Sequence, residues 1–180
     1  MRDIAEEITG EWLRFVKKCE FVEYDVKEYE GANTAQTEID VIAINPSNKE
    51  IYICEVAAHV NGLNYKRGRK STEEILKDKF EKDKFYLDKN FSGKGFADFK
   101  KHYMLWSPFV GPTTLQAIQK KVQNPLFEKY GIELELIVNR EYHTKLQDLR
   151  QEAAKTTKNL SNFPVLRLLQ IEEHLHKKTV

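Results

Sequence analysis

The alternation of apolar and polar residues is most regular from Thr37 to Val60, TEIDVIAINPSNKEIYICEVAAHV. The pattern predicts two strands joined by a tight turn, and because both faces are apolar, we expect the hairpin to be covered on both sides. A turn centred between Ser47 and Asn48 pairs residues whose numbers sum to 95. Two carboxylates interrupt the apolar pattern, Asp40 and Glu55, and this register places them opposite each other.

The rest of the chain alternates between helical and strand patterns. Apolar spacing predicts helices at 3–18, 71–87, 112–131 and 144–157, and an amphipathic helix after Pro164. Further strands are predicted at 21–26, 102–110 and 132–139. This order predicts an α/β sandwich with a central mixed sheet flanked by helices. We expect an α/β domain over 1–142 and a C-terminal helical extension over 143–180, packed on that domain or used for dimerisation.

The helix predicted at 71–87 carries a polar residue on its buried side. Its core-facing stripe contains Leu76, Phe80, Asp83 and Leu87, and Lys79 lies at the edge of that stripe. The covering helix is therefore expected to bring charged groups toward the sheet.

Two like charges facing each other inside a covered sheet are costly unless a cation joins them. The simplest such cation is a divalent metal with oxygen ligands, Mg²⁺ or Mn²⁺. Asp40 and Glu55 are then metal ligands, and Glu11, on the apolar stripe of the first helix, is a candidate third ligand. The alternative is structural: a lysine from a covering helix pairs with the carboxylates.

Charge is unevenly distributed along the 180 residues, although the net charge is only +1. Residues 1–65 carry 6 basic and 13 acidic residues, whereas residues 66–102 carry 12 basic and 7 acidic. Acid around a metal site followed by base suits a polyanion such as nucleic acid. The basic residues expected to hold the nucleic-acid backbone are Lys66, Arg67, Arg69 and Lys70. The alternative for this stretch is a solvated surface.

Composition and hydropathy narrow the class of protein. No N-terminal apolar segment or long apolar run is present, so we expect a cytoplasmic protein without membrane segments. Cys19 and Cys54 show no CxxC spacing and are expected to be reduced, buried thiols.

Asp40 and the element Glu55-Val56-Ala57 resemble the site of the PD-(D/E)XK, or restriction-endonuclease-like, nuclease superfamily. The resemblance covers about residues 1–110 and implies a helix, a three-strand meander, a helix and a fourth strand (αβββαβ). It also implies a metal-dependent endonuclease that hydrolyses phosphodiester bonds, with DNA favoured over RNA. Glu11 matches the glutamate that many members supply from the first helix.

The chain departs from the superfamily's motif at the position that usually holds a catalytic lysine, which is Ala57 here. Two residues are candidates to replace it: Lys79 from the covering helix, and His59 on the same strand face as Glu55. The alternative is a catalytically impaired module that binds nucleic acid or a protein partner. The final apolar helix, from Val165 to Leu175, is a candidate homodimer surface in either case.

Overall fold

The computed structural model describes residues 3–29, 35–59, 62–65, 70–93, 95–157 and 160–178. The helices are α1 (Ile4–Phe15), α2 (Thr72–Asn90), α3 (Pro112–Ile118), α4 (Asn124–Tyr130), α5 (Arg140–Lys155) and α6 (Pro164–Lys178), with a π-helical segment, η1 (Gln119–Gln123), between α3 and α4. The strands are β1 (Phe21–Tyr29), β2 (Ala35–Asn45), β3 (Glu50–Val56), β4 (Lys100–Ser107) and β5 (Leu134–Val138). The order of elements is the one predicted from the hydrophobic pattern, except that the single helix predicted at 112–131 consists of α3, η1 and α4.

The strands form one mixed sheet in the order β1-β2-β3-β4-β5. The pairs β1–β2 and β2–β3 are antiparallel, whereas β3–β4 and β4–β5 are parallel. The β2–β3 register runs from Val41↔Cys54 to Asn45↔Glu50, so the predicted sum of 95 is confirmed. The predicted α/β class with a mixed sheet flanked by helices is therefore confirmed.

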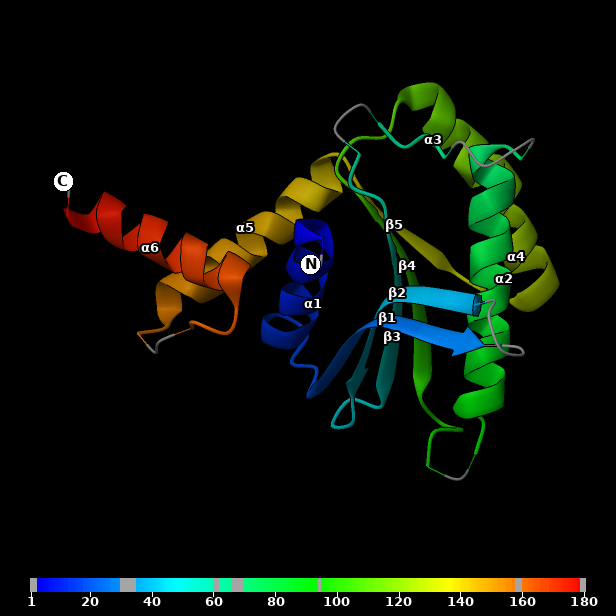
Figure 1. Ribbon diagram of the computed structural model, residues 1–180, viewed down its shortest axis with the longest axis horizontal. Coiled ribbons are helices and arrows are strands. Elements are labelled where there is room, and N and C mark those ends of the chain that lie inside the picture. Colours follow the sequence, from blue (N-terminus) through cyan, green and yellow to red (C-terminus); the bar gives the residue numbers. More distant parts are fainter. Residues whose placement is uncertain are drawn as a thin grey trace.

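Both faces of the sheet are covered, as the double apolar pattern of the hairpin predicts. Helices α2, α3 and α4 lie on one side of the sheet, and α1, α5 and α6 lie on the other (Figure 1). Ile42, Ile51 and Ile53 pack on the α2 side, whereas Val41 and Cys54 pack on the α1 side. Each strand thus contributes to two cores, because successive side chains point to opposite faces.

The C-terminal helices share the core on the α1 side. Leu149 of α5 and Leu166 of α6 belong to the same buried cluster as Trp12 and Leu13 of α1. On the outer side of α6, large apolar side chains stay exposed: Leu168, Ile171 and Leu175. These lie within the surface predicted for dimerisation, which stays a prediction.

Helix α1 packs closely against β1 through a glycine. A Cβ on Gly10 would lie 2.1 Å from the hydroxyl oxygen of Tyr24, a distance that only the absence of a side chain permits. The helix ends at Phe15, earlier than the predicted residue 18. Lys18 adopts a left-handed conformation with φ +59°. Cys19 and Cys54 are buried and unpaired by disulfide, as expected.

Helix α2 begins with a complete capping box between Ser71 and Glu74. The predicted stripe of Leu76, Phe80, Asp83 and Leu87 is buried against the sheet. Helix α5 begins at Arg140 rather than near 144, because the side chain of Asn139 fixes the preceding turn. That side chain accepts a hydrogen bond from Val110 N and donates one to Val110 O, both at 2.9 Å.

A polar cluster lies at the opposite end of β3 and β4 from the carboxylates described below. The ring of His102 lies 3.1 Å from Glu135 through Nδ1 and 3.3 Å from Glu50 through Nε2. It also stacks on Tyr52, with ring centroids 4.7 Å apart. In the described part of the chain, no helix is both long and apolar enough to cross a bilayer.

Candidate functional site

Asp40 lies where the β1–β2 ribbon bends. Residues two positions apart on a regular strand point to the same face. Here Tyr24 and Val41 pack on the α1 side, whereas Val26 and Ile39, two positions away, pack on the α2 side. Asp25, between Tyr24 and Val26, has φ +51°, a conformation that non-glycine residues rarely adopt. The bend turns the Asp40 carboxylate across β3, where Oδ2 accepts a hydrogen bond of 2.7 Å from Val56 N.

Glu55 is fully buried beneath α2, and its carboxylate Oε2 accepts a hydrogen bond from Lys79 Nζ. Lys79 Nζ also lies 3.6 Å from Asp40 Oδ2, so one ammonium group bridges the two carboxylates. Burial favours the neutral form of Lys79, but attraction to Glu55 and Asp40 outweighs it and raises the lysine pKa above its ordinary value. Lys79 therefore pairs with Asp40 and Glu55, which is the contact given above as the structural alternative to a metal ion.

Asp83, one turn after Lys79 on α2, adds another carboxylate to this place. Both of its oxygens are buried, and neither has a hydrogen-bond partner in the described residues. Burial raises the pKa of Asp83, and Lys79 acts against this shift. Burial likewise raises the pKa of Glu55 well above its usual range, with repulsion from Asp83 and Asp40 as further causes. Burial therefore favours the neutral form of both Glu55 and Asp83, and Lys79 opposes this effect.

Glu6, in the first turn of α1, is a site residue that sequence reasoning missed. Burial, with repulsion from Asp25 and Asp40 as further causes, raises the pKa of Glu6 to about 7. Its Oε2 is buried without a hydrogen-bond partner in the described residues. Glu6 follows the helix-capping residue Asp3 by three positions, a spacing typical of a helix start, so the sequence signal indicated capping. We call Glu6, Asp40, Glu55 and Asp83 the acid group.

Glu11 does not join the acid group. Its carboxylate accepts hydrogen bonds from Val165 N (3.1 Å) and Leu166 N (2.6 Å), so it caps the first turn of α6. Burial raises the pKa of Glu11 to about 7, and the two backbone donors oppose that shift. The apolar stripe of α1 that contains Glu11 does face the core, as predicted, but the part of the core next to Glu11 is formed by α6.

Ala57 occupies the position where the superfamily's motif places a lysine. It is buried on the α2 side of the sheet, and its backbone N donates a 2.8 Å hydrogen bond to Trp106 O. The ammonium of Lys79 instead supplies the positive charge beside Glu55. His59 is exposed, and its ring lies edge-on to Tyr65, with centroids 5.9 Å apart. Of the two candidate substitutes, the structure brings Lys79 to the carboxylates.

The basic stretch is described only at its end. Lys66, Arg67 and Arg69 lie outside the described residues. Lys70 is exposed and pairs with Asp78 of α2. Its predicted contact with a nucleic-acid backbone stays a prediction.

The acid group has the donor chemistry for a hard divalent cation, because carboxylate oxygens are the ligands that Mg²⁺ and Mn²⁺ prefer. Asp40 of β2 interacts with Glu55 of β3 on one side and with Glu6 of α1 on the other. Within the residues that the structure describes, no set of three His, Cys, Asp or Glu side chains is already spaced to hold a metal ion. To bind a metal ion, the carboxylates must therefore move toward one another, and Lys79 must give up one of its contacts with Glu55 and Asp40.

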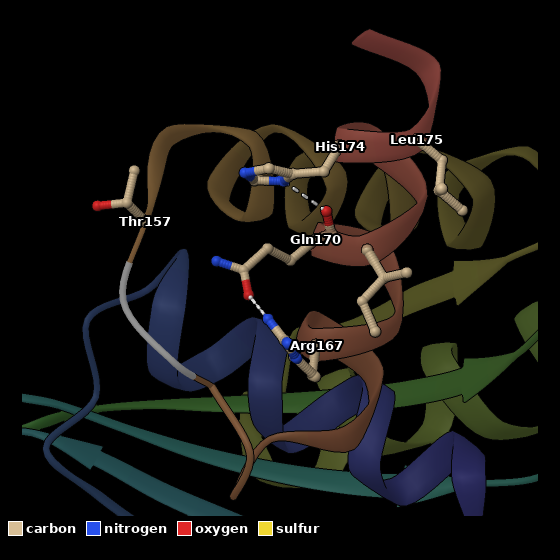
Figure 2. Close-up of a pocket in the computed structure, with 6 residues that line it drawn as sticks. Thr157, Arg167, Gln170, His174 and Leu175 are labelled. Carbon is tan, nitrogen blue, oxygen red and sulfur yellow. Dashed lines mark hydrogen bonds between the residues drawn. The ribbon is translucent and has the colours of Figure 1, made fainter. Parts of the chain in front are cut away.

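A pocket of about 280 Å³ lies elsewhere, on α6 (Figure 2). Arg167 Nη1 donates a 2.6 Å hydrogen bond to Gln170 Oε1, and His174 Nδ1 lies 2.8 Å from Gln170 O. The pocket belongs to the helices on the α1 side of the sheet, away from α2. We assign it no part in the chemistry of the acid group.

Comparison of the chain with family models, curated proteins and solved structures found no match.

Proposed function

We propose that the protein is a metal-dependent nuclease that hydrolyses phosphodiester bonds in DNA, with Mg²⁺ or Mn²⁺ as cofactor. One observation carries the proposal: Asp40, Glu55 and Lys79 come from three different elements and meet at one place. Carboxylates can hold a metal ion that assists phosphodiester hydrolysis, and a lysine beside them can stabilise the charge that develops on the phosphate. The order of α1, the β1–β3 meander, α2 and β4 also fits the αβββαβ core that the resemblance implies.

The acid group is suited to hold the cation through Asp40 and Glu55, with Glu6 as the preferred third ligand. We favour Glu6 over Glu11 because the Glu11 carboxylate is already engaged by the backbone of α6. When bound, a divalent cation lowers the pKa of a water molecule and polarises a phosphate oxygen.

Lys79 takes the role of the motif lysine in this proposal. The nearby carboxylates keep its ammonium protonated at neutral pH. Its side chain is 25% exposed, so it is accessible from solvent while Glu55 below it is not. A protonated lysine at this edge stabilises the negative charge that develops on the phosphate. The exposed His59 is then a residue near the rim of the site without a required role.

A second candidate function is a nuclease-fold module that binds nucleic acid or protein without cutting. The observation that favours it is the same bridge: Lys79 already offsets part of the charge of Asp40 and Glu55, so a metal is not needed to hold them together. The lysine of the motif itself is absent, since Ala57 replaces it.

An assay that measures cutting and binding together separates these functions. The purified chain is incubated with supercoiled plasmid, single-stranded DNA or RNA, in Mg²⁺, Mn²⁺ or EDTA, beside Asp40→Asn. The matched control is Asp98→Asn, which alters an exposed carboxylate paired with Lys49. Metal-dependent cutting by the wild type and the control, but not by Asp40→Asn, supports the nuclease. Salt-sensitive binding without cutting in any metal supports the binding module.

A further inference from the structure

Three carboxylate oxygens at the centre of the acid group have no hydrogen-bond partner in the described residues: Glu55 Oε1, Asp83 Oδ1 and Asp83 Oδ2. Both residues are 0% exposed. Buried polar atoms in proteins are nearly always paired, so three such atoms on neighbouring side chains require an explanation. Asp83 follows Lys79 by one turn on the buried side of α2, and Lys79 binds Glu55, so the two carboxyl groups lie beneath the same part of the helix.

Lys79 does not satisfy these oxygens. Its hydrogen bond goes to Glu55 Oε2, and its second contact is with Asp40. The positive charge therefore lies on one oxygen of Glu55, while the other oxygen shares its surroundings with Asp83. A single proton shared between Glu55 and Asp83 joins only two of the three oxygens and leaves the third without a partner. Carboxylate oxygens are the ligands of hard divalent cations, so all three oxygens are suitable ligands for one such ion.

We propose that Asp83 and Glu55 form a second divalent-cation position, reached through the Glu55 oxygen that Lys79 does not bind. The position suits Mg²⁺ or Mn²⁺, because every available donor is a carboxylate oxygen. Its role is charge compensation: it offsets the repulsion that otherwise accumulates around Glu55 and fixes the orientation of that side chain. The proposal rests on the proposed function, since Glu55 then contributes one oxygen to each of two cation positions.

The test is the number of Mn²⁺ ions bound per folded chain, measured by the electron paramagnetic resonance signal of free Mn²⁺ during a titration without DNA. Two-metal sites bind ions at neighbouring positions, so the wild type is expected to bind about two ions per chain. Asp83→Asn keeps the side chain's shape and is expected to bind about one ion under the same conditions. The matched control is Asp88→Asn on the same helix, whose side chain is 45% exposed and pairs with Lys84 and Lys101. It should bind as many ions as the wild type.

Circular dichroism shows whether Asp83→Asn folds, and the wild-type count can overturn the proposal without that variant. A single ion in the wild type overturns the second position, and the nuclease proposal survives if metal-dependent cutting persists. Two ions in the wild type, with one lost in Asp83→Asn, support it even if no substrate is cut, in which case the nuclease proposal alone fails. Two ions in both the wild type and folded Asp83→Asn overturn the assignment to Asp83.

Discussion

Replacing Lys79 with methionine tests the electrostatic structure of the acid group. Methionine keeps most of the aliphatic length that packs beneath α2 and removes only the ammonium. The change leaves Glu55, which is fully buried, and Asp40, whose side chain is 14% exposed, without the cation that bridges them. The variant therefore isolates the charge from the packing of the side chain.

The structure sets the expected size of the effect. Removing one partner of a buried ion pair costs about 3–5 kcal/mol, because the other charge stays buried and unpaired. The lysine side chain is 25% exposed, so solvent screens part of the interaction and the lower end, about 3 kcal/mol, is expected. For a chain of this length that loss corresponds to a fall in Tm of about 6–12 °C.

The assay is urea unfolding followed by tryptophan fluorescence, since Trp12 and Trp106 are both buried. The matched control is Lys77→Met, which removes a lysine whose nearest carboxylate, on Glu81, is 4.0 Å away on the helix surface. The control is expected to lose less than about 0.5 kcal/mol. Addition of Mg²⁺ should stabilise Lys79→Met more than the wild type, because a divalent cation can replace the missing charge. Equal losses in the two variants would refute the reasoning.

Glu11→Ala removes the two hydrogen bonds that hold the first turn of α6, so the free energy of unfolding should fall by about 1–3 kcal/mol. The rate of DNA cutting per folded molecule should not change. A large loss of cutting would indicate that Glu11 is a metal ligand after all. The hydrogen bond from His102 lowers the pKa of Glu135. This contact stabilises the fold above about pH 4.5 and is lost as pH falls through the lower folded pKa. His102→Phe keeps an aromatic ring stacked on Tyr52. Between about pH 6 and pH 3, roughly the range in which carboxylates titrate, the variant should lose less stability than the wild type. An unchanged pH profile would contradict this. Gly10→Ala should lose about 1–3 kcal/mol in urea unfolding because its Cβ meets Tyr24, whereas Gly93→Ala, with open space around it, should not.

The central hairpin could be predicted because its physics is local. The alternation of apolar residues and the position of the turn fix the register, and the register places Asp40 near Glu55. Helical periodicity then predicts that Lys79 lies at the inner edge of α2, above the same strands. These steps require only the period of each element and its order in the chain.

The missed features depend on contacts between distant segments. Helical periodicity shows that Glu11 is buried, but not that α6, more than 150 residues later, supplies its partners. Glu6 interacts with Asp25 and Asp40, and this contact between α1 and the β1–β2 ribbon cannot be read from the pattern of either element alone. The start of α5 was predicted too late because the side chain of Asn139 binds a distant turn.

The most direct test of the account is the rate of DNA cutting in Mg²⁺ by the wild type, Asp40→Asn and Asp98→Asn, compared at equal amounts of folded protein. The account predicts metal-dependent cutting by the wild type and by Asp98→Asn. It predicts a rate about 100–1000-fold lower for Asp40→Asn, because a group that stabilises the transition state is lost. Equal rates for Asp40→Asn and the wild type, or no cutting by the wild type on any DNA in Mg²⁺ or Mn²⁺, would contradict the assignment of the acid group as a nuclease site.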